Sequence, residues 1–284
     1  MTSAGALTLN IVDDVRQLFT YHFMVNALAA GTAVAVMGAA IGWFMVLRRQ
    51  AFAGHSLSLI AFPGAAAATL AGLPAASGYF AACGLGAIAL SPTSSVRSRS
   101  SETALIGTVQ AFALACGFLF VALYNGLLNG TTALLFGSFV GITDAQVITL
   151  VLIAVVGLCL LALAGRPLVF ASLDEGGAAA AGVPVRLLAT AFLLLLGLTV
   201  AATAQITGTL LVFTLLVTPA ATAQALTTRP VAGIALAIAI VLLVTWAGLG
   251  IAYFSPLPAG FWITSLSFGL FVLARLGRAI AARS

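Results

Sequence analysis

The chain alternates between long apolar runs and short polar intervals, and this pattern predicts its elements. A helix needs about 20 mostly apolar residues to cross the hydrocarbon core of a membrane. The pattern predicts nine spans, near residues 22–47, 54–72, 75–91, 102–128, 146–164, 185–206, 208–226, 230–253 and 260–275. The predicted fold is therefore an all-α integral membrane protein, a polytopic bundle of about nine helices in a single transmembrane domain, 1–284.

Polar intervals add three smaller elements to this prediction. Residues 1–20 do not resemble a cleavable signal peptide, because the acidic Asp13 and Asp14 precede the first apolar run and no basic region comes first. An amphipathic segment at the membrane surface is expected there instead. Residues 129–145 contain an apolar piece too short to span, which favours an interfacial or re-entrant helix. Within the second span, Pro63 and Gly64 are expected to interrupt the helix.

Basic residues support the number of spans and give an orientation. The arginine clusters beyond residue 20 follow predicted spans one, three, five, seven and nine. Because arginines are retained on the cytoplasmic side, the N-terminus is expected outside and the C-terminus inside. The interval 166–186, which contains further polar residues, then becomes cytoplasmic.

Composition excludes a soluble domain. The chain is 62% hydrophobic and 6% charged, with a mean hydropathy of +1.22, whereas soluble domains have about 25% charged residues. All eleven cations are arginines, and the net charge of +5 indicates topology rather than nucleic-acid binding. Three separated cysteines, Cys83, Cys116 and Cys159, are interpreted as small core residues and not as a disulfide framework or metal cluster.

A short helix is predicted at 172–182, within a region at 168–184 that the expected orientation places in the cytoplasm. Ser172 and Glu175 form a capping-box pattern, and Asp174 adds negative charge to the first turn. Gly182 stands where a C-terminal cap belongs. Such a helix is either a docking element or a plain connector.

Ionisable groups inside a membrane are candidates for function because they are costly to bury. His55 opens the second span, and Ser58 lies on the same helical face. An imidazole with a nearby hydroxyl suits transient binding of a borderline cation. The alternative is an ordinary interfacial histidine.

A second candidate is the seventh span. Thr218 and Pro219 mark a kink whose free carbonyls threonine hydroxyls can satisfy, and Gln205 is a buried amide shortly before it. This helix is either a kinked packing helix or one wall of a pathway. Small residues also predict close helix packing, at Gly38, Gly42, Gly84, Gly86, Gly107 and Gly117.

The chain resembles the zinc/manganese/iron permease family of ABC importers. The resemblance is carried in order by Arg-Arg…Gly-x-x-Leu-Ser…Pro-Gly, Glu102-Thr103-Ala104-Leu105-Ile106-Gly107, Leu135-Phe136-Gly137-Ser138, Gly182-Val183-Pro184-Val185, Gly208-Thr209-Leu210-Leu211-Val212, Thr218-Pro219-Ala220-Ala221-Thr222-Ala223 and Tyr253-Phe254-Ser255-Pro256-Leu257-Pro258-Ala259-Gly260. It extends over nearly the whole chain with the spacings kept.

The resemblance implies a type II ABC importer-like permease in the bacterial plasma membrane, forming a homodimer around a central pathway. Its partners would be two cytoplasmic ATPases and an extracytoplasmic metal-binding protein. The chain itself would be no enzyme and carry no cofactor, because ATP binds to the partner. The short helix would be the coupling helix that seats in the ATPase, with Ser172, Asp174, Glu175, Ala179 and Gly182 as its functional residues.

One departure from the family concerns the ion path. Where the family usually has Gly-Asp-x-x-Ser/Ala-His, this chain has Gly54-His55-Ser56-Leu57-Ser58-Leu59. The acid is replaced by His55 and the histidine by Leu59. An imidazole suits Zn²⁺ better than Mn²⁺, so zinc is expected, with His55 and Ser58 as ligands.

Other interpretations stay open at this point. The missing family ligand also permits a weaker waypoint for the ion, pairing with a non-identical permease subunit, or a different substrate such as an iron chelate or another small solute. An ATPase-independent channel or secondary carrier is disfavoured, because the spans contain almost no titratable groups. A membrane enzyme is disfavoured because no paired nucleophile and base, phosphate loop or paired carboxylates occur.

Overall fold

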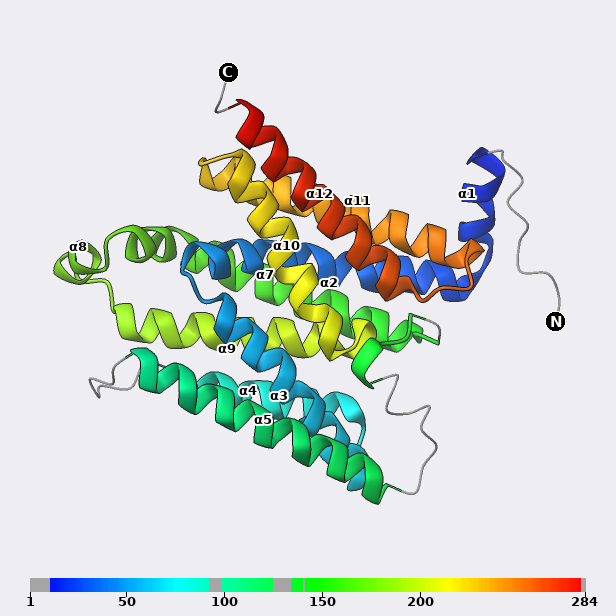
Figure 1. Cartoon of the computed structure of the whole chain (residues 1–284), viewed down its shortest axis with the longest axis horizontal. Coiled ribbons are helices and arrows are strands. Elements are labelled where there is room, and N and C mark those ends of the chain that lie inside the picture. Colours follow the sequence, from blue (N-terminus) through cyan, green and yellow to red (C-terminus); the bar gives the residue numbers. More distant parts are fainter. Residues whose placement is uncertain (1–10, 92–98, 125–133, 140, 282–284) are drawn as a thin grey trace. The chain divides into compact units, whose positions relative to one another are not determined.

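The computed structural model describes residues 11–91, 99–124, 134–139 and 141–281, nearly all of which are helical (Figure 1). The helices are α1 (Ile11–Thr20), α2 (His22–Leu47), α3 (Ala51–Leu70), α4 (Ala75–Ala89), α5 (Arg99–Leu123), α7 (Asp144–Leu173), α8 (Glu175–Ala180), α9 (Val185–Thr207), α10 (Thr209–Leu226), α11 (Pro230–Phe254) and α12 (Ala259–Ala281). Each predicted span matches one helix. The all-α membrane fold is confirmed.

Among the described residues, seven helices are long and apolar enough to cross a membrane. The two others that match predicted spans are shorter, Ala75–Ala89 and the part of α5 from Gly107 to Leu123. Residues 1–10 of the predicted surface segment, 125–128 of the predicted fourth span, and 129–133 and 140 of the predicted re-entrant segment lie outside the described residues. Within the predicted re-entrant segment, residues 134–136 form one helical turn.

Two boundaries differ from the prediction because prolines do not end the helices. The helix α3 continues through Pro63, so the predicted interruption there is wrong. The helix α7 continues through Pro167 to Leu173, well past the predicted end at residue 164. In lipid a helix cannot leave its backbone groups unpaired, so continuing past a single missing N–H is cheaper than unwinding.

The chain divides into two compact units, which are described separately. Unit 1 comprises residues 1–43, 138–155 and 214–284, and unit 2 comprises 44–137 and 156–213.

In unit 2, α3 packs on α4, α5 and α9, and α4 also packs on α9. The closest contact is between α3 and α4, where a β-carbon at Gly78 would overlap the carbonyl oxygen of Gly64. On α9, a β-carbon at Gly197 would lie 2.8 Å from the carbonyl oxygen of Cys83. Such contacts let backbones approach closely where no hydrophobic effect drives association.

Unit 1 is held by similar contacts. The helix α11 packs on α12 and on α1. A β-carbon at Gly42 would overlap the carbonyl oxygen of Leu216. The side chain of Gln224 donates a hydrogen bond to the carbonyl oxygen of Trp43 at 2.8 Å.

The packing roles predicted for glycines hold at some positions and fail at others. Gly38, Gly42, Gly86 and Gly117 each face a neighbouring helix closely, as predicted. The prediction is wrong for Gly84 and Gly107 within the described part of this chain, where a β-carbon would meet nothing within 4 Å. Similarly, Cys83 is buried but Cys159 is exposed, so the latter is no core residue.

Two motifs of the family resemblance meet in unit 2. Gly137 and Gly208 both have left-handed backbones, with φ of 75° and 72°. A β-carbon on either would overlap the backbone of the other segment. The short turn 134–136 therefore rests directly on the junction of α9 and α10, which only glycines permit at this distance.

The contact between α3 and α4 predicts that alanine substitutions at Gly78 and Gly84 differ in their effect on stability. Gly78→Ala adds a methyl group against the backbone of Gly64, and overpacking of this kind destabilises by about 1–3 kcal/mol. Gly84→Ala on the same helix meets open space and should be neutral or stabilising by up to about 1 kcal/mol. Thermal unfolding of the purified variants measures the difference. Equal melting temperatures for the two would contradict the proposed packing.

Candidate functional site

The short helix α8 has well-defined ends, though its start differs from the prediction. Asp174 is the N-cap, and its carboxylate accepts a hydrogen bond from the Gly177 amide at 2.8 Å. Ser172 does not cap the helix, so the capping-box prediction is wrong. It lies within the last turn of α7, where its hydroxyl donates to the carbonyl oxygen of Leu168.

The other end of α8 is confirmed as predicted. Gly182 has a φ of 82° and its amide donates to the carbonyl oxygen of Ala179 at 3.0 Å. The next amide, of Val183, donates to Ala178 at 3.0 Å. This pair of bonds is the Schellman motif, which satisfies the last carbonyls of a helix.

The two faces of α8 differ in exposure. Ala178 is fully buried, while Asp174, Glu175, Ala179 and Gly182 are exposed. A small, exposed alanine surface beside two carboxylates is thus available to another molecule. The helix packs on α9.

Arg48 holds this region to the connection between α2 and α3. Its Nη1 donates to the hydroxyl of Ser172 at 3.3 Å, and its guanidinium carbon lies 5.5 Å from the centre of the Phe192 ring on α9. Burial lowers the pKa of Arg48, and the nearby Glu175 carboxylate opposes this shift. The sequence indicated Arg48 only as a topology signal and gave no sign of these contacts.

His55, the predicted metal ligand, lies one turn into α3. Its ring packs against that of Phe213 in a T-shaped arrangement, with centroids 5.0 Å apart. Its Nδ1 is buried and has no hydrogen-bond partner among the described residues. Ser58 is also buried, and its hydroxyl donates to the backbone carbonyl oxygen of His55 at 2.8 Å. The described residues contain no group of three or more His, Cys, Asp or Glu side chains placed to hold a metal ion.

The pathway candidates fall in both units. In unit 2 the Gln205 amide lies 3.5 Å from the carbonyl oxygen of Ala201. In unit 1 the Thr222 hydroxyl donates to the carbonyl oxygen of Thr218 at 2.7 Å. The carbonyl that Pro219 leaves without its usual amide partner belongs to Leu215, four residues earlier, so this threonine serves a different group.

A groove of about 680 Å³ lies between α7 and α9 in unit 2. Its lining is entirely apolar, namely Leu160, Leu163, Ala164, Leu168, Leu188, Ala191, Phe192, Leu194, Leu195 and Leu198. It offers no ligand to a cation.

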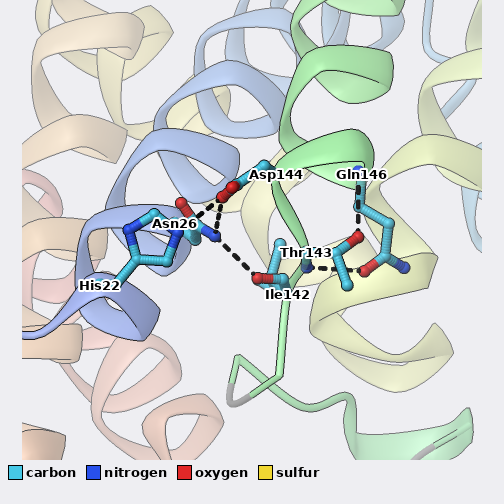
Figure 2. A network of polar contacts seen from close by, with 6 residues as sticks. All are labelled: His22, Asn26, Ile142, Thr143, Asp144 and Gln146. Atoms are coloured by element: carbon cyan, nitrogen blue, oxygen red, sulfur yellow. Dashed lines mark hydrogen bonds and ion pairs between the residues drawn. The ribbon is translucent and has the colours of Figure 1, made fainter.

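A polar network in unit 1 was missed by the sequence reasoning (Figure 2). Asp144, the first residue of α7, accepts one hydrogen bond from Asn26 at 2.7 Å and pairs with His22 at 2.8 Å. Asn26 is buried and also reaches the carbonyl oxygen of Ile142 at 3.0 Å. The network joins the start of α2 to the start of α7.

The same network includes a genuine capping box. The hydroxyl of Thr143 accepts from the Gln146 amide at 3.3 Å, and the Gln146 side chain accepts from the Thr143 amide at 3.2 Å (Figure 2). The Thr-x-x-Gln spacing was the signal that could have identified this helix start.

Comparison with known proteins decides the family. The model of the ABC 3 transport family matches residues 20–278. The chain belongs to this family. It is a translocation subunit rather than an enzyme, and a multi-pass protein of the bacterial plasma membrane.

Similar proteins cover most of the chain. The chelated iron transport system membrane protein YfeC of Yersinia pestis is 34% identical over 75% of this chain and 72% of its own length. The manganese transport system membrane protein MntC of Halalkalibacterium halodurans is 29% identical over 91% of this chain and 88% of its own. The structure of PsaBC from Streptococcus pneumoniae in complex with Fab matches 93% of this chain and 95% of that chain, with 26% identity and a TM-score of 0.82.

The N-cap of α8 can be tested directly. Asp174→Ala removes the bond to Gly177, which costs about 1 kcal/mol of helix stability. Glu175→Ala is the matched control, because Glu175 makes no capping bond. We expect faster amide hydrogen exchange across residues 175–183 in the first variant only. Equal exchange in both variants would rule out Asp174 as the cap.

Proposed function

We propose that this chain is the membrane-spanning permease subunit of an ABC importer that moves a divalent metal ion, zinc. Its membership of the ABC 3 transport family supports the permease role. Relatives named for manganese and iron transport support a metal or metal chelate as cargo. The choice of zinc rests on one residue, His55.

The buried Nδ1 atom of His55 is the observation behind this choice. A buried polar atom without a partner is costly, and a bound ion is one way to compensate it. The ring of Phe213 packs against the imidazole in a T-shaped arrangement and so limits its rotation. The Ser58 hydroxyl keeps an oxygen lone pair while it donates to the backbone.

The chemistry of the donor favours zinc over manganese. Neutral imidazole suits Zn²⁺, whereas Mn²⁺ prefers carboxylate and water oxygens. The six acids of the chain are Asp13, Asp14, Glu102, Asp144, Asp174 and Glu175, and none is in the middle of a predicted span. Weak binding by a single protein ligand is compatible with transport, because the ion must also leave the site.

The proposed partners follow from the same role. A cytoplasmic ATPase would seat on α8, through the exposed face of Asp174, Glu175, Ala179 and Gly182. An extracytoplasmic binding protein would deliver the ion to the opposite side, and a second copy of the chain would complete the pathway. Gln205, Thr218 and Pro219 remain candidates for its wall.

If the ATPase docks on α8, tryptophan substitutions at two exposed alanines should differ in their effect on copurification of the ATPase. Ala179→Trp places a large ring on the exposed face of α8 and should reduce copurification of the ATPase at least tenfold. Ala71→Trp is the control, because Ala71 is equally exposed but ends α3 at its far end. Charge reversal of Asp174 and Glu175 together should act like Ala179→Trp. Normal copurification of all variants would disprove the docking surface.

Transport assays test whether His55 binds the transported ion. Vesicles holding the chain, its ATPase and its binding protein should take up Zn²⁺ with ATP, and His55→Ala should lower the rate about tenfold or more. His22→Ala, at the chain's other histidine, should leave it unchanged. His55→Asp, which restores the residue usual in the family, should raise uptake of Mn²⁺ relative to Zn²⁺.

Other outcomes have definite meanings. Zinc uptake that is unaffected by His55→Ala would remove His55 from the path. Uptake of neither ion would favour an iron chelate or another solute on the same architecture. Uptake that continues without ATP would favour a channel or carrier and overturn the importer proposal.

A further inference from the structure

A basic groove lies at one end of unit 1, where α10 ends, α11 begins and α12 ends. It has a volume of about 490 Å³ and is lined by Ala225, Leu226, Thr227, Thr228, Arg229, Gly277 and Arg278. Arg229 and Arg278 come from segments about 50 residues apart in sequence, and the fold brings them to one hollow. The groove is distant in sequence from His55 and from α8, and neither role proposed above uses it.

Among the described residues, no acidic side chain lines the groove. No Asp or Glu follows Glu175 in the sequence, so the charged side chains of α10, α11, α12 and the loops between them are all arginines. Among the described residues of unit 1, the only ion pair is that of His22 with Asp144, which belong to neither α10, α11 nor α12. Two guanidinium groups beside one hollow without an acid indicate an anionic ligand.

The remaining donors of the groove also suit an anion. Arg278 is positioned by one hydrogen bond, from Nη1 to the carbonyl oxygen of Ala225 at 2.7 Å, which leaves its other N–H groups available. Arg229 is the N-cap of α11, and its side chain does not cap the helix. Pro230 begins the helix and has no N–H group, so the first backbone amide of α11 is that of Val231. Helix N-termini favour anions through their free amides and dipole.

The surroundings indicate that the anion is carried by a lipid. Large apolar side chains next to the groove are exposed: Leu226, Val231, Leu276 and Ile280, with Val231 82% exposed. The helices α11 and α12 that carry three of them are long and apolar enough to span a membrane. A headgroup in the groove would therefore have its acyl chains against these side chains.

We propose that this groove, defined by Arg229, Arg278 and the two threonines, binds the phosphate of an anionic phospholipid headgroup. The guanidinium groups supply charge-assisted hydrogen bonds and the threonine hydroxyls supply neutral ones. Basic pockets between membrane helices at the interface are known to hold such headgroups. The site is independent of the transported cargo.

Lipid titration of the purified full-length chain tests the proposal. Native mass spectrometry would follow binding of phosphatidylglycerol and, as the neutral probe, phosphatidylcholine. We expect one tight phosphatidylglycerol that Arg229→Gln and Arg278→Gln each weaken roughly fivefold. Arg186→Gln is the matched control, an exposed arginine outside the groove, and should bind as the unmodified chain does.

Further variants and a competing anion distinguish lipid binding from binding of other anions and from misfolding of the variants. Arg229→Lys and Arg278→Lys keep the charge and should retain most of the binding. Among the described residues, the Arg229 side chain forms no hydrogen bond or ion pair, so its variant remains informative if Arg278→Gln unfolds. Equal retention of both lipids, or full displacement by millimolar inorganic phosphate, would overturn the lipid site. A third result would also overturn the lipid site: the variant with both Arg229→Gln and Arg278→Gln binds phosphatidylglycerol normally but no longer copurifies with the ATPase. The groove would then bind an acidic protein surface.

Discussion

The close approach of α3 and α4 at Gly64 and Gly78 is the constraint on which unit 2 depends. Lipid is as apolar as leucine, so helices gain little by hiding apolar surface and must gain by van der Waals contact instead. This contact fixes α3, and α3 carries His55. It also lets α4 reach α9, whose Phe192 supports Arg48. The candidate ligand and the short helix α8 are thus positioned by the same packed group of helices.

Much of the fold was predictable because hydrophobic length is a strong signal in a membrane protein. Each predicted span corresponds to a helix in the described chain, and Gly182 ends α8 as expected. The failures came where local signals compete. Ser172 and Asp174 are both good N-caps, and the sequence favoured Ser172 because Glu175 completed a capping box. The continuation of α7 through Pro167 took Ser172 into that helix and left Asp174 as the cap.

Prediction of the candidate site was limited for a different reason. His55 stood out because few ionisable residues lie in the spans. Contacts between distant segments left no local pattern, so neither the bond of Arg48 to Ser172 nor that of Asn26 to Asp144 was foreseen. The Gly84 and Gly107 errors have the same origin. Spacing shows that a residue is small, but only the fold shows which neighbour it faces.

The bond between Arg48 and Ser172 has a mechanical consequence. Ser172 stands two residues before the cap of α8, and Arg48 stands three residues before the first residue of α3. A force that displaces the end of α7 must either break this bond or pull the start of α3 with it. The imidazole of His55 lies one turn beyond that start. Arg48 therefore links the end of α7 to the start of α3, the helix that carries His55.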